Sequence, residues 1–393
     1  MKAVRLKAEW APRKGFVLGP KDIDGKLTYL GSRVWHNPTV VIEDVAEPEI
    51  ADDEVLVEVK ACGICGSDVH MAQVDKEGYM LYPGLTAFPA TLGHEFGGIV
   101  VDAGKFAFNN RTNRRFRKGE PVCAEEMFWC GRCRPCADGY PNHCEALEEI
   151  GFSCDGAFAP YVKLKAKYCW SLEPLKDRYS EEDLFLAGSL VEPTSVAYNA
   201  VIERGGGIRP GDNVAILGGG PIGLAATAIL RRAGASNVIL SEPSKSRAKL
   251  GKKMGATAII NPLKENFAEK LLDLTDGMGA NLYLEATGLP GVVWPGIEDA
   301  IWCGRALNSV VVIVARADAK IPLTGEVLQV RRASVIGSQG HSGHGTFPRV
   351  ISAMGAGMDM TPLITKRINL DEVPENLKLL QTDREECKIT AIL

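Results

Sequence analysis

The chain has 393 residues, of which 46% are hydrophobic and 24% charged, and 45 Lys and Arg against 49 Asp and Glu leave a net charge of −4. The length predicts about two to three domains, and the composition argues against a disordered chain. So weak a charge does not draw a whole protein onto nucleic acid or an anionic membrane, and we expect neither partner.

The 11 cysteines are the unusual part of this composition, and their number is odd. Residues 1–8 alternate basic and apolar side chains, which is typical of a strand and not of a secretory signal. The longest apolar run, 310–315, is far shorter than the ~20 residues that span a bilayer. We therefore expect a cytoplasmic protein whose cysteines bind metal or serve catalysis rather than form disulfides.

Short strand-like runs between Gly- and Pro-rich turns characterise the first half of the chain, for example at residues 40–42 and 54–59. From about residue 200, strands alternate with helical stretches. The predicted strands are 214–217, 237–240, 258–260, 282–285 and 310–314, and the first is followed by a helix over 222–233. This alternation predicts an α/β domain with a doubly wound parallel sheet and right-handed crossovers.

The regularity ends near residue 340, where a loop is predicted at 341–345. We expect three segments: a first domain over 1–195, an inserted α/β domain over 196–338, and a C-terminal segment, 339–393, that returns to the first domain. Two further segments, 9–35 and 109–118, look like insertions or loops. The second is strongly basic, which usually indicates a solvated surface loop.

Gly218, Gly220 and Gly223 supply the G-x-G-x-x-G spacing of dinucleotide-binding loops. The spacing alone is weak evidence, but here it follows a predicted strand and opens a predicted helix. Gly218 allows the tight turn, Gly220 lets a pyrophosphate approach the backbone, and Gly223 allows close helix–strand packing. The dipole and the amides at the start of the helix, where Ile222 lies, then face the phosphates.

Glu242 lies 19 residues after Gly223, at the end of the next predicted strand. A carboxylate there accepts hydrogen bonds from the adenosine ribose and repels a 2′-phosphate, which favours NAD over NADP. Lys245 and Arg247 lie nearby, and Arg247 is expected beside the cofactor, where its charge partly offsets that repulsion. The alternative is a plain packing turn with a surface glutamate.

Cys130, Cys133, Cys136 and Cys144 follow one another as C-x2-C-x2-C-x7-C. Four thiolates so close in sequence can surround one tetrahedral Zn²⁺ with Zn–S distances of about 2.3 Å, and a site without a vacant position is structural. An iron–sulfur cluster is the alternative. Against it, Glu145 rather than proline follows the last cysteine, and the sequence has no second cysteine cluster.

A second candidate group is dispersed along the chain and consists of Cys65, His94, Glu95 and Glu192. A single cysteine is usually a small core residue, and an isolated histidine more often forms a hydrogen bond than binds metal. Cys62 and Cys65 also spell C-x-x-C, so a redox pair is an alternative, although no thioredoxin-like context surrounds it. The co-occurrence with a dinucleotide loop and a four-cysteine site favours a metal centre.

At these residues the chain resembles the zinc-dependent medium-chain dehydrogenases/reductases, the family of the alcohol and polyol dehydrogenases. The resemblance covers nearly the whole length and rests on five motifs in the family's order. They are GICGSD at 63–68, GHE at 93–95, the four cysteines, VEP at 191–193 and the glycine-rich loop. The resemblance implies a mainly-β GroES-like catalytic domain beside a Rossmann domain that binds NAD.

The resemblance also implies roles for single residues. Cys65 and His94 would bind a catalytic zinc, and Glu95 and Glu192 would complete its coordination or alternate in it. Many alcohol dehydrogenases have a cysteine in place of Glu192, and the glutamate resembles the sorbitol-dehydrogenase-like branch. Asp68 would accept a hydrogen bond from the His94 ring and fix its tautomer.

The implied activity is zinc- and NAD-dependent oxidation of a secondary alcohol on a polyol or cyclitol, such as a keto-inositol oxidised to a diketo-inositol in inositol catabolism. Zinc would stabilise the alkoxide, and Ser67 and His70 would relay the proton to solvent. His341 and His344 could hydrogen-bond the substrate. The alternatives are L-threonine or a sugar as substrate, or a non-catalytic nucleotide-binding zinc protein. A homodimer or homotetramer is typical of the family.

Overall fold

The computed structural model describes residues 1–19, 22, 27–317 and 320–393, so part of the predicted insertion at 9–35 lies outside the described residues. The chain forms two compact units. Unit 1 comprises Met1–Glu192, Ser342–Asp383 and Lys388–Leu393, and unit 2 comprises Pro193–His341 and Arg384–Cys387. Among the described residues, no helix has the length and apolar character needed to cross a membrane.

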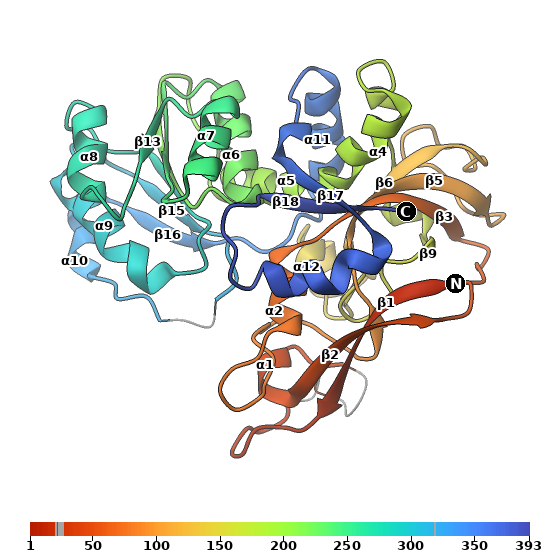
Figure 1. The fold of residues 1–393 in the computed structure, drawn as a ribbon. Helices are drawn as coiled ribbons and strands as arrows, with labels where there is room; N and C mark the ends of the chain where they lie inside the picture. The colour runs from red at the N-terminus through yellow and green to blue at the C-terminus, as the bar shows by residue number, and fades with distance from the viewer. Residues whose placement is uncertain (20–21, 23–26, 318–319) are drawn as a thin grey trace. The chain divides into compact units, whose positions relative to one another are not determined.

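Unit 1 is built on a seven-stranded sheet that draws on both ends of the chain (Figure 1). Its strands are β3 (Glu54–Gly63), β5 (Glu95–Ala103), β6 (Pro121–Ala124), β9 (Tyr161–Lys165), β10 (Cys169–Ser171), β17 (Ile364–Asn369) and β18 (Lys388–Ile392). The order is β10-β6-β5-β3-β18-β17, with β9 paired to β3. The last strand of the chain therefore lies inside the sheet.

Strand β3 shows why this segment forms a strand. Val55, Val57 and Val59 are buried and alternate with less buried positions, which is the period of two that a strand imposes. Beyond them Ala61 and Cys62 are also buried, because β5 and β18 pair with β3 at this end. The mainly-β character expected of the first domain is confirmed.

Smaller elements complete unit 1. A three-stranded sheet consists of β1 (Lys2–Trp10), β2 (Trp35–Asp44) and β4 (Ala90–Thr91), and a two-stranded one of β7 (Met127–Phe128) and β8 (Glu148–Glu149). The helices are α1 (Gly31–Val34), α2 (Gly66–Ala72), α3 (Arg134–Ala137), α4 (Glu181–Ser189), α11 (Thr346–Gly355) and α12 (Val373–Leu379). The basic segment at 109–118 forms turns, and its residues 111–115 are exposed.

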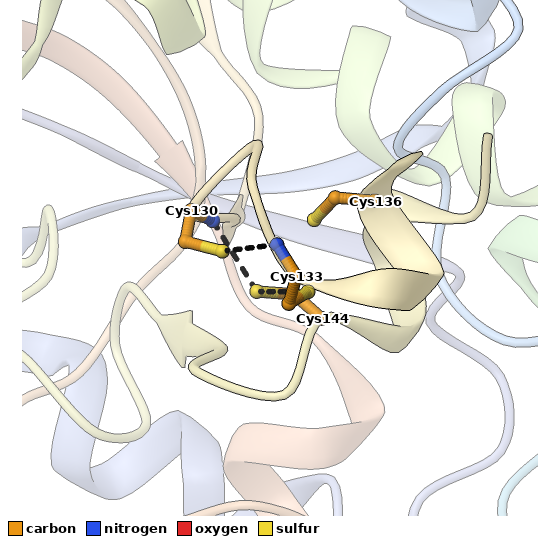
Figure 2. A group of neighbouring side chains, drawn as sticks. All are labelled: Cys130, Cys133, Cys136 and Cys144. Carbon is orange, nitrogen blue, oxygen red and sulfur yellow. Dashed lines mark hydrogen bonds between the residues drawn. The ribbon is translucent and has the colours of Figure 1, made fainter. Parts of the chain in front are cut away.

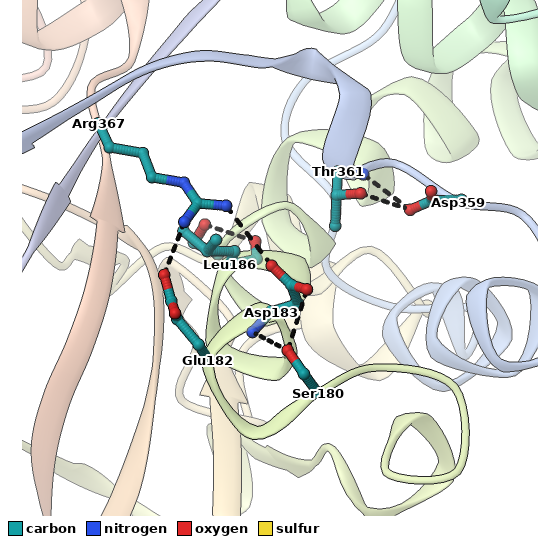
Figure 3. Close-up of polar contacts among 8 residues, drawn as sticks. Ser180, Glu182, Asp183, Leu186, Asp359, Thr361 and Arg367 are labelled. Atoms are coloured by element: carbon teal, nitrogen blue, oxygen red, sulfur yellow. Dashed lines mark hydrogen bonds and ion pairs between the residues drawn. The ribbon is translucent and has the colours of Figure 1, made fainter.

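The C-terminal segment is joined to helix α4 by polar contacts (Figure 3). Ser180 caps α4 by accepting from the Asp183 amide at 3.2 Å. Arg367 of β17 pairs with Glu182 at 2.6 Å and with Asp183 at 3.5 Å. Exposed ion pairs of this kind stabilise by at most about 1 kcal/mol each, so the buried strand pairing holds the segment in place.

Unit 2 contains a six-stranded parallel sheet. Its strands are β11 (Asn213–Leu217), β12 (Asn237–Ser241), β13 (Ala258–Ile260), β14 (Leu282–Glu285), β15 (Val310–Ile313) and β16 (Ser334–Gly337). The order β13-β12-β11-β14-β15-β16 is the 3-2-1-4-5-6 order of the doubly wound dinucleotide-binding fold. The predicted strands and the parallel sheet are confirmed.

The helices of unit 2 follow its strands, as crossover connections require. They are α6 (Pro221–Ala233), α7 (Lys245–Lys253), α8 (Phe267–Leu274), α9 (Pro290–Cys303) and α10 (Gly325–Arg331). Residues Arg384–Cys387 also belong to this unit, although the sequence placed all of 339–393 with the first domain. The reason is that Ser246 Oγ and the Arg247 guanidinium donate to the carbonyls of Glu385 and Glu386.

Candidate functional site

The four cysteines predicted to bind zinc lie together in unit 1 (Figure 2). One sulfur each from Cys130, Cys133, Cys136 and Cys144 lies within 4.8 Å of the other three. A tetrahedron with Zn–S bonds of about 2.3 Å has edges of about 3.8 Å, and the Sγ atoms of Cys133 and Cys144 are 3.8 Å apart. A disulfide would need about 2.0 Å. The four thiols therefore fit one zinc ion with no position left for a substrate.

Backbone amides around these sulfurs favour the thiolate form that zinc binds. The amides of Arg132 and Cys133 donate to Cys130 Sγ at 3.4 Å, and they lower the pKa of the Cys130 thiol to about 6. The Cys130 amide donates to Cys144 Sγ at 3.2 Å. Burial raises the pKa of Cys136 to about 12, so ionisation of that thiol at neutral pH needs the charge of a metal ion.

A second group forms where β3 ends and β5 begins. Antiparallel pairing places Gly63 opposite Glu95, which brings the turn at Cys65 beside His94. The Cys65 amide donates to Asp68 Oδ2 at 2.9 Å and so fixes the start of α2. One ligand atom each from Cys65, His94 and Glu95 lies within 4.8 Å of the other two. A mixed set of three protein ligands is the composition of a catalytic zinc site, which keeps an open position.

His94 is buried among acidic groups. Its ring packs against Phe152 with centroids 4.7 Å apart, and its Nδ1 lies 3.8 Å from Asp68 Oδ1. Burial lowers the pKa of His94, but Asp68, Cys65 and Glu192 outweigh it and raise the pKa well above its ordinary value. An imidazole surrounded by anions suits a site that holds a metal cation.

The predicted hydrogen bond between the His94 ring and Asp68 is not formed at this distance. Among the described residues, neither His94 Nδ1 nor Asp68 Oδ1 has a hydrogen-bond partner. The physical reason is that the other oxygen of Asp68 is held by the Cys65 amide. Both atoms are buried and 3.8 Å apart, so the role of Asp68 in fixing the His94 tautomer stays a prediction.

Glu95 takes part in a contact that the sequence did not reveal. Lys388, the first residue of β18, donates through Nζ to Glu95 Oε2 and, at 2.9 Å, to the Ile64 carbonyl. Both side chains are buried, with exposed fractions of 2% for Lys388 and 1% for Glu95. Gly63 leaves the space for this pair, since a Cβ there would lie 2.5 Å from Glu95 Oε2.

The remaining residues predicted around the catalytic zinc occupy two helices. Glu192 is 6% exposed and acts electrostatically on His94, but among the described residues it is not part of the group formed by Cys65, His94 and Glu95. Ser67 and His70 lie three residues apart on α2, which places them on one face. His70 is exposed, and Ser67 Oγ is a buried atom without a partner among the described residues.

The C-x-x-C alternative meets an obstacle in the structure. Cys62 lies in β3 with an exposed fraction of 0%, and burial raises the pKa of its thiol well above the ordinary value. Reactive redox cysteines have accessible thiols with a low pKa. The structure therefore favours a core role for Cys62.

The glycine-rich loop of unit 2 connects β11 to α6. Gly218 has φ +104°, and a Cβ at Gly223 would lie 1.9 Å from the Gly218 carbonyl, so both positions require glycine. Gly220 caps α6 and has open space beside it. The amides of Ile222 and Gly223 belong to the first turn of α6, whose amides have no acceptor within the helix. The loop therefore presents donors to an anion.

Glu242 follows β12 and is fixed at this loop. Its Oε2 accepts from the Gly219 amide at 2.6 Å and its Oε1 from the Ser244 amide at 2.7 Å. Gly219, whose amide supplies one of these contacts, was not among the residues predicted to bind the cofactor. The Arg247 guanidinium donates twice to the Glu386 carbonyl, at 3.1 and 2.5 Å. Arg247 is thus directed at its own unit's backbone, although it was expected beside the cofactor.

The two histidines expected near the substrate differ in environment. His341 has an exposed fraction of 0% and belongs to unit 2, whereas His344 belongs to unit 1 and is exposed. The His344 ring lies 6.4 Å from that of Tyr140, in an edge-on arrangement. A role for either histidine in substrate binding stays a prediction.

Comparisons with known proteins agree with these two units. Residues 51–174 match the alcohol dehydrogenase GroES-like domain, and residues 221–356 match the zinc-binding dehydrogenase domain. The scyllo-inosose 3-dehydrogenase of Thermotoga maritima is 67% identical over 393 residues, which cover 100% of both chains. The L-threonine 3-dehydrogenase of Caldanaerobacter subterraneus subsp. tengcongensis is 32% identical over 363 residues, 91% of this chain and 96% of that one.

A solved structure extends the likeness to three dimensions. A Thermotoga maritima protein described as an alcohol dehydrogenase has a TM-score of 0.97 and 67% identity, with 100% of both chains covered. The GroES-like and Rossmann fold classes implied by the sequence motifs are confirmed by the two matching domains and by this structure.

Proposed function

We propose that this chain oxidises scyllo-inosose to a diketo-inositol and transfers the hydride to NAD. The chain belongs to the zinc-binding alcohol dehydrogenase family, and it is therefore an oxidoreductase that acts on CH–OH groups. The observation that carries the chemistry is the buried group of Cys65, His94 and Glu95, which is separate from the four-cysteine site. The full-length identity of 67% supports the substrate and a place in inositol catabolism.

The donor sets of the chain fit two zinc ions of different kinds. Four thiols suit a structural ion, whereas a thiol, an imidazole and a carboxylate suit a catalytic one. Cys65, His94 and Glu95 would hold the catalytic ion, and Glu192 would complete its surroundings. The loop from Gly218 to Gly223 would hold the NAD pyrophosphate, with Glu242 on the adenosine ribose.

Bound zinc would supply Lewis-acid chemistry at the substrate oxygen, and bound NAD would supply the hydride acceptor. The chain's own residues would transfer the proton of the substrate hydroxyl and orient the His94 ring. The buried Ser67 Oγ would accept the substrate's hydroxyl proton while it gives its own proton to the exposed His70 on the same helix face, and His70 would release a proton to solvent. Asp68 would orient the His94 ring through a hydrogen bond to Nδ1, which lies 3.8 Å from Asp68 Oδ1 in this structure.

A substrate survey with the zinc-loaded protein tests this function. NAD reduction is measured with scyllo-inosose, myo-inositol, sorbitol and L-threonine, before and after treatment with a chelator. We expect kcat/KM for scyllo-inosose to exceed that for sorbitol by at least about tenfold, because a site that hydrogen-bonds several hydroxyls discriminates strongly. Turnover of sorbitol but of no cyclitol would contradict the substrate, and chelator-resistant turnover would contradict the zinc mechanism.

L-threonine is a second candidate substrate, favoured by the relative with 32% identity. The same survey decides between the two, because L-threonine carries an ammonium and a carboxylate that a polyol site does not pair. A homodimer or homotetramer is our proposal for the assembly, and light scattering of the purified protein tests it.

A further inference from the structure

The buried ion pair between Lys388 and Glu95 lies beside the proposed catalytic metal and has no role in the proposed chemistry. Lys388 contacts the residue before Cys65 through the Ile64 carbonyl, and Glu95 is itself the residue after His94. Lys388 of the last strand thus contacts the chain neighbours of both Cys65 and His94. The pairing of β18 with β3, in which Thr390 lies opposite Gly63, fixes this position.

The ammonium group changes what Glu95 can offer to a metal. Oε2 of Glu95 is engaged by Lys388, while a Glu95 oxygen belongs to the group with Cys65 and His94. A carboxylate with one oxygen engaged in a charge-assisted hydrogen bond binds a metal through the other. A catalytic zinc site must also keep one position open for the substrate.

We propose that Lys388 is a positioning residue that restricts Glu95 to weak ligation of the catalytic zinc through one oxygen and so keeps a coordination position open for the substrate oxygen. The proposal rests on the proposed function only in assuming a catalytic zinc at Cys65, His94 and Glu95. The absence of a side chain at Gly63 supports it, because any Cβ there would displace Glu95 Oε2.

Replacing Lys388 tests the proposal, because the proposal and a purely structural role predict opposite changes in the rate of zinc release. In Lys388→Met both Glu95 oxygens become available to the metal, and changes in the contacts of a metal ligand typically alter metal affinity by about tenfold or more. We expect zinc release from the catalytic site to a chromogenic chelator to become slower by about the same factor. We also expect the visible spectrum of the cobalt-substituted site to change towards higher coordination number, and kcat to fall. A merely structural lysine would give the opposite result, faster release from a loosened site.

Three variants complete the design. Lys388→Arg retains the charge and should restore the wild-type cobalt spectrum and release rate. The double variant Lys388→Met, Glu95→Gln also removes the Glu95 carboxylate that the single variant frees. Zinc release from it should therefore not be slowed. Lys366→Met is the matched control, because Lys366 lies on the neighbouring strand β17 and donates to Asn376 instead. The four-cysteine zinc serves as an internal reference in every variant.

The outcomes separate this inference from the proposed function, since neither zinc release nor the cobalt spectrum requires a substrate. Slower release from Lys388→Met supports the inference even if the protein oxidises no cyclitol. Unchanged or faster release with an unchanged cobalt spectrum overturns it even in an active enzyme. If Lys388→Met does not fold, Lys388→Gln keeps a neutral donor to the Ile64 carbonyl, and the same two measurements on that variant decide.

Discussion

Glu242 holds a fixed position at the glycine-rich loop, because both of its oxygens accept hydrogen bonds from backbone amides. A 2′-phosphate placed against this carboxylate would meet like charge, whereas ribose hydroxyls would find an acceptor. Arg247, the nearby guanidinium, donates to the Glu386 carbonyl. These contacts support the preference for NAD that the sequence predicts.

Glu242→Gln tests this preference with little change in shape. A hydrogen bond to a charged group contributes about 1.5–3 kcal/mol, and about 1.4 kcal/mol is a tenfold change in an equilibrium constant. We therefore expect the ratio of kcat/KM for NAD to that for NADP to fall at least about tenfold. Glu269→Gln, an exposed carboxylate on α8 of the same unit, is the control. An unchanged ratio in Glu242→Gln would assign the cofactor choice to other residues.

For single residues, the sequence predicts best those sites whose members lie close together in the chain. The four cysteines were predicted because one short segment carries all of them and their spacing is itself the signal. Lys388 was missed because its partner Glu95 lies 293 positions away. In the sequence, Lys388 looks like an ordinary surface lysine at the start of an apolar strand. Its burial follows only from the position of β18 inside the sheet.

The lobe between β7 and β8 is the element on which the four-cysteine site depends. Its regular structure consists of α3, with four residues, and one three-residue turn of 3-10 helix, Pro141–His143. Its apolar cluster has few fully buried members, Cys144 among them. Elements so short cannot bury enough apolar surface to fold by themselves, so we expect metal binding to supply the folding free energy of the lobe.

Cys133→Ser is expected to release one zinc per chain and to lower Tm by more than about 5 °C, because the loss of a structural ligand unfolds the lobe. Zinc content and thermal unfolding measure both effects. Cys65→Ala is the matched comparison. It should also release one zinc and abolish turnover, but with Tm within about 2 °C of the wild type, since its neighbours lie in the large sheet. Equal losses of Tm in the two variants would contradict the separate roles.

The two units differ in how far their elements could be predicted. In unit 2 each strand pairs with strands that follow the same local α/β alternation, and β11 to β15 appear at the expected residues. In unit 1 the strands β5, β6, β9 and β10 were not predicted, and neither was the position of β18 between β3 and β17. Their pairing is non-local, and short runs in turn-rich sequence carry little periodic signal.

On the scale of the whole molecule, the two units depend on different parts of the chain. All six strands of the parallel sheet lie between residues 213 and 337, so unit 2 can form its sheet without the end of the chain. Unit 1 cannot, because β18 pairs with both β3 and β17 in the interior of its sheet. Ile389 and Ala391 of this strand have exposed fractions of 0%.

Removal of residues 388–393 should therefore damage one unit and spare the other. Without β18, strands β3 and β17 lose their shared neighbour and Glu95 keeps a buried charge without Lys388, which is strongly destabilising. In hydrogen exchange followed by mass spectrometry, we expect amide protection to be lost in β3 and β5 and kept in β11, β12 and β14. Deletion of Leu393 alone is the control, since it leaves β18 intact. It removes one partly buried side chain and the 3.2 Å hydrogen bond from the Leu393 amide to the Lys60 carbonyl, and should change the protection of neither unit. Loss of protection in both units of the truncated chain would show that they fold as one cooperative body.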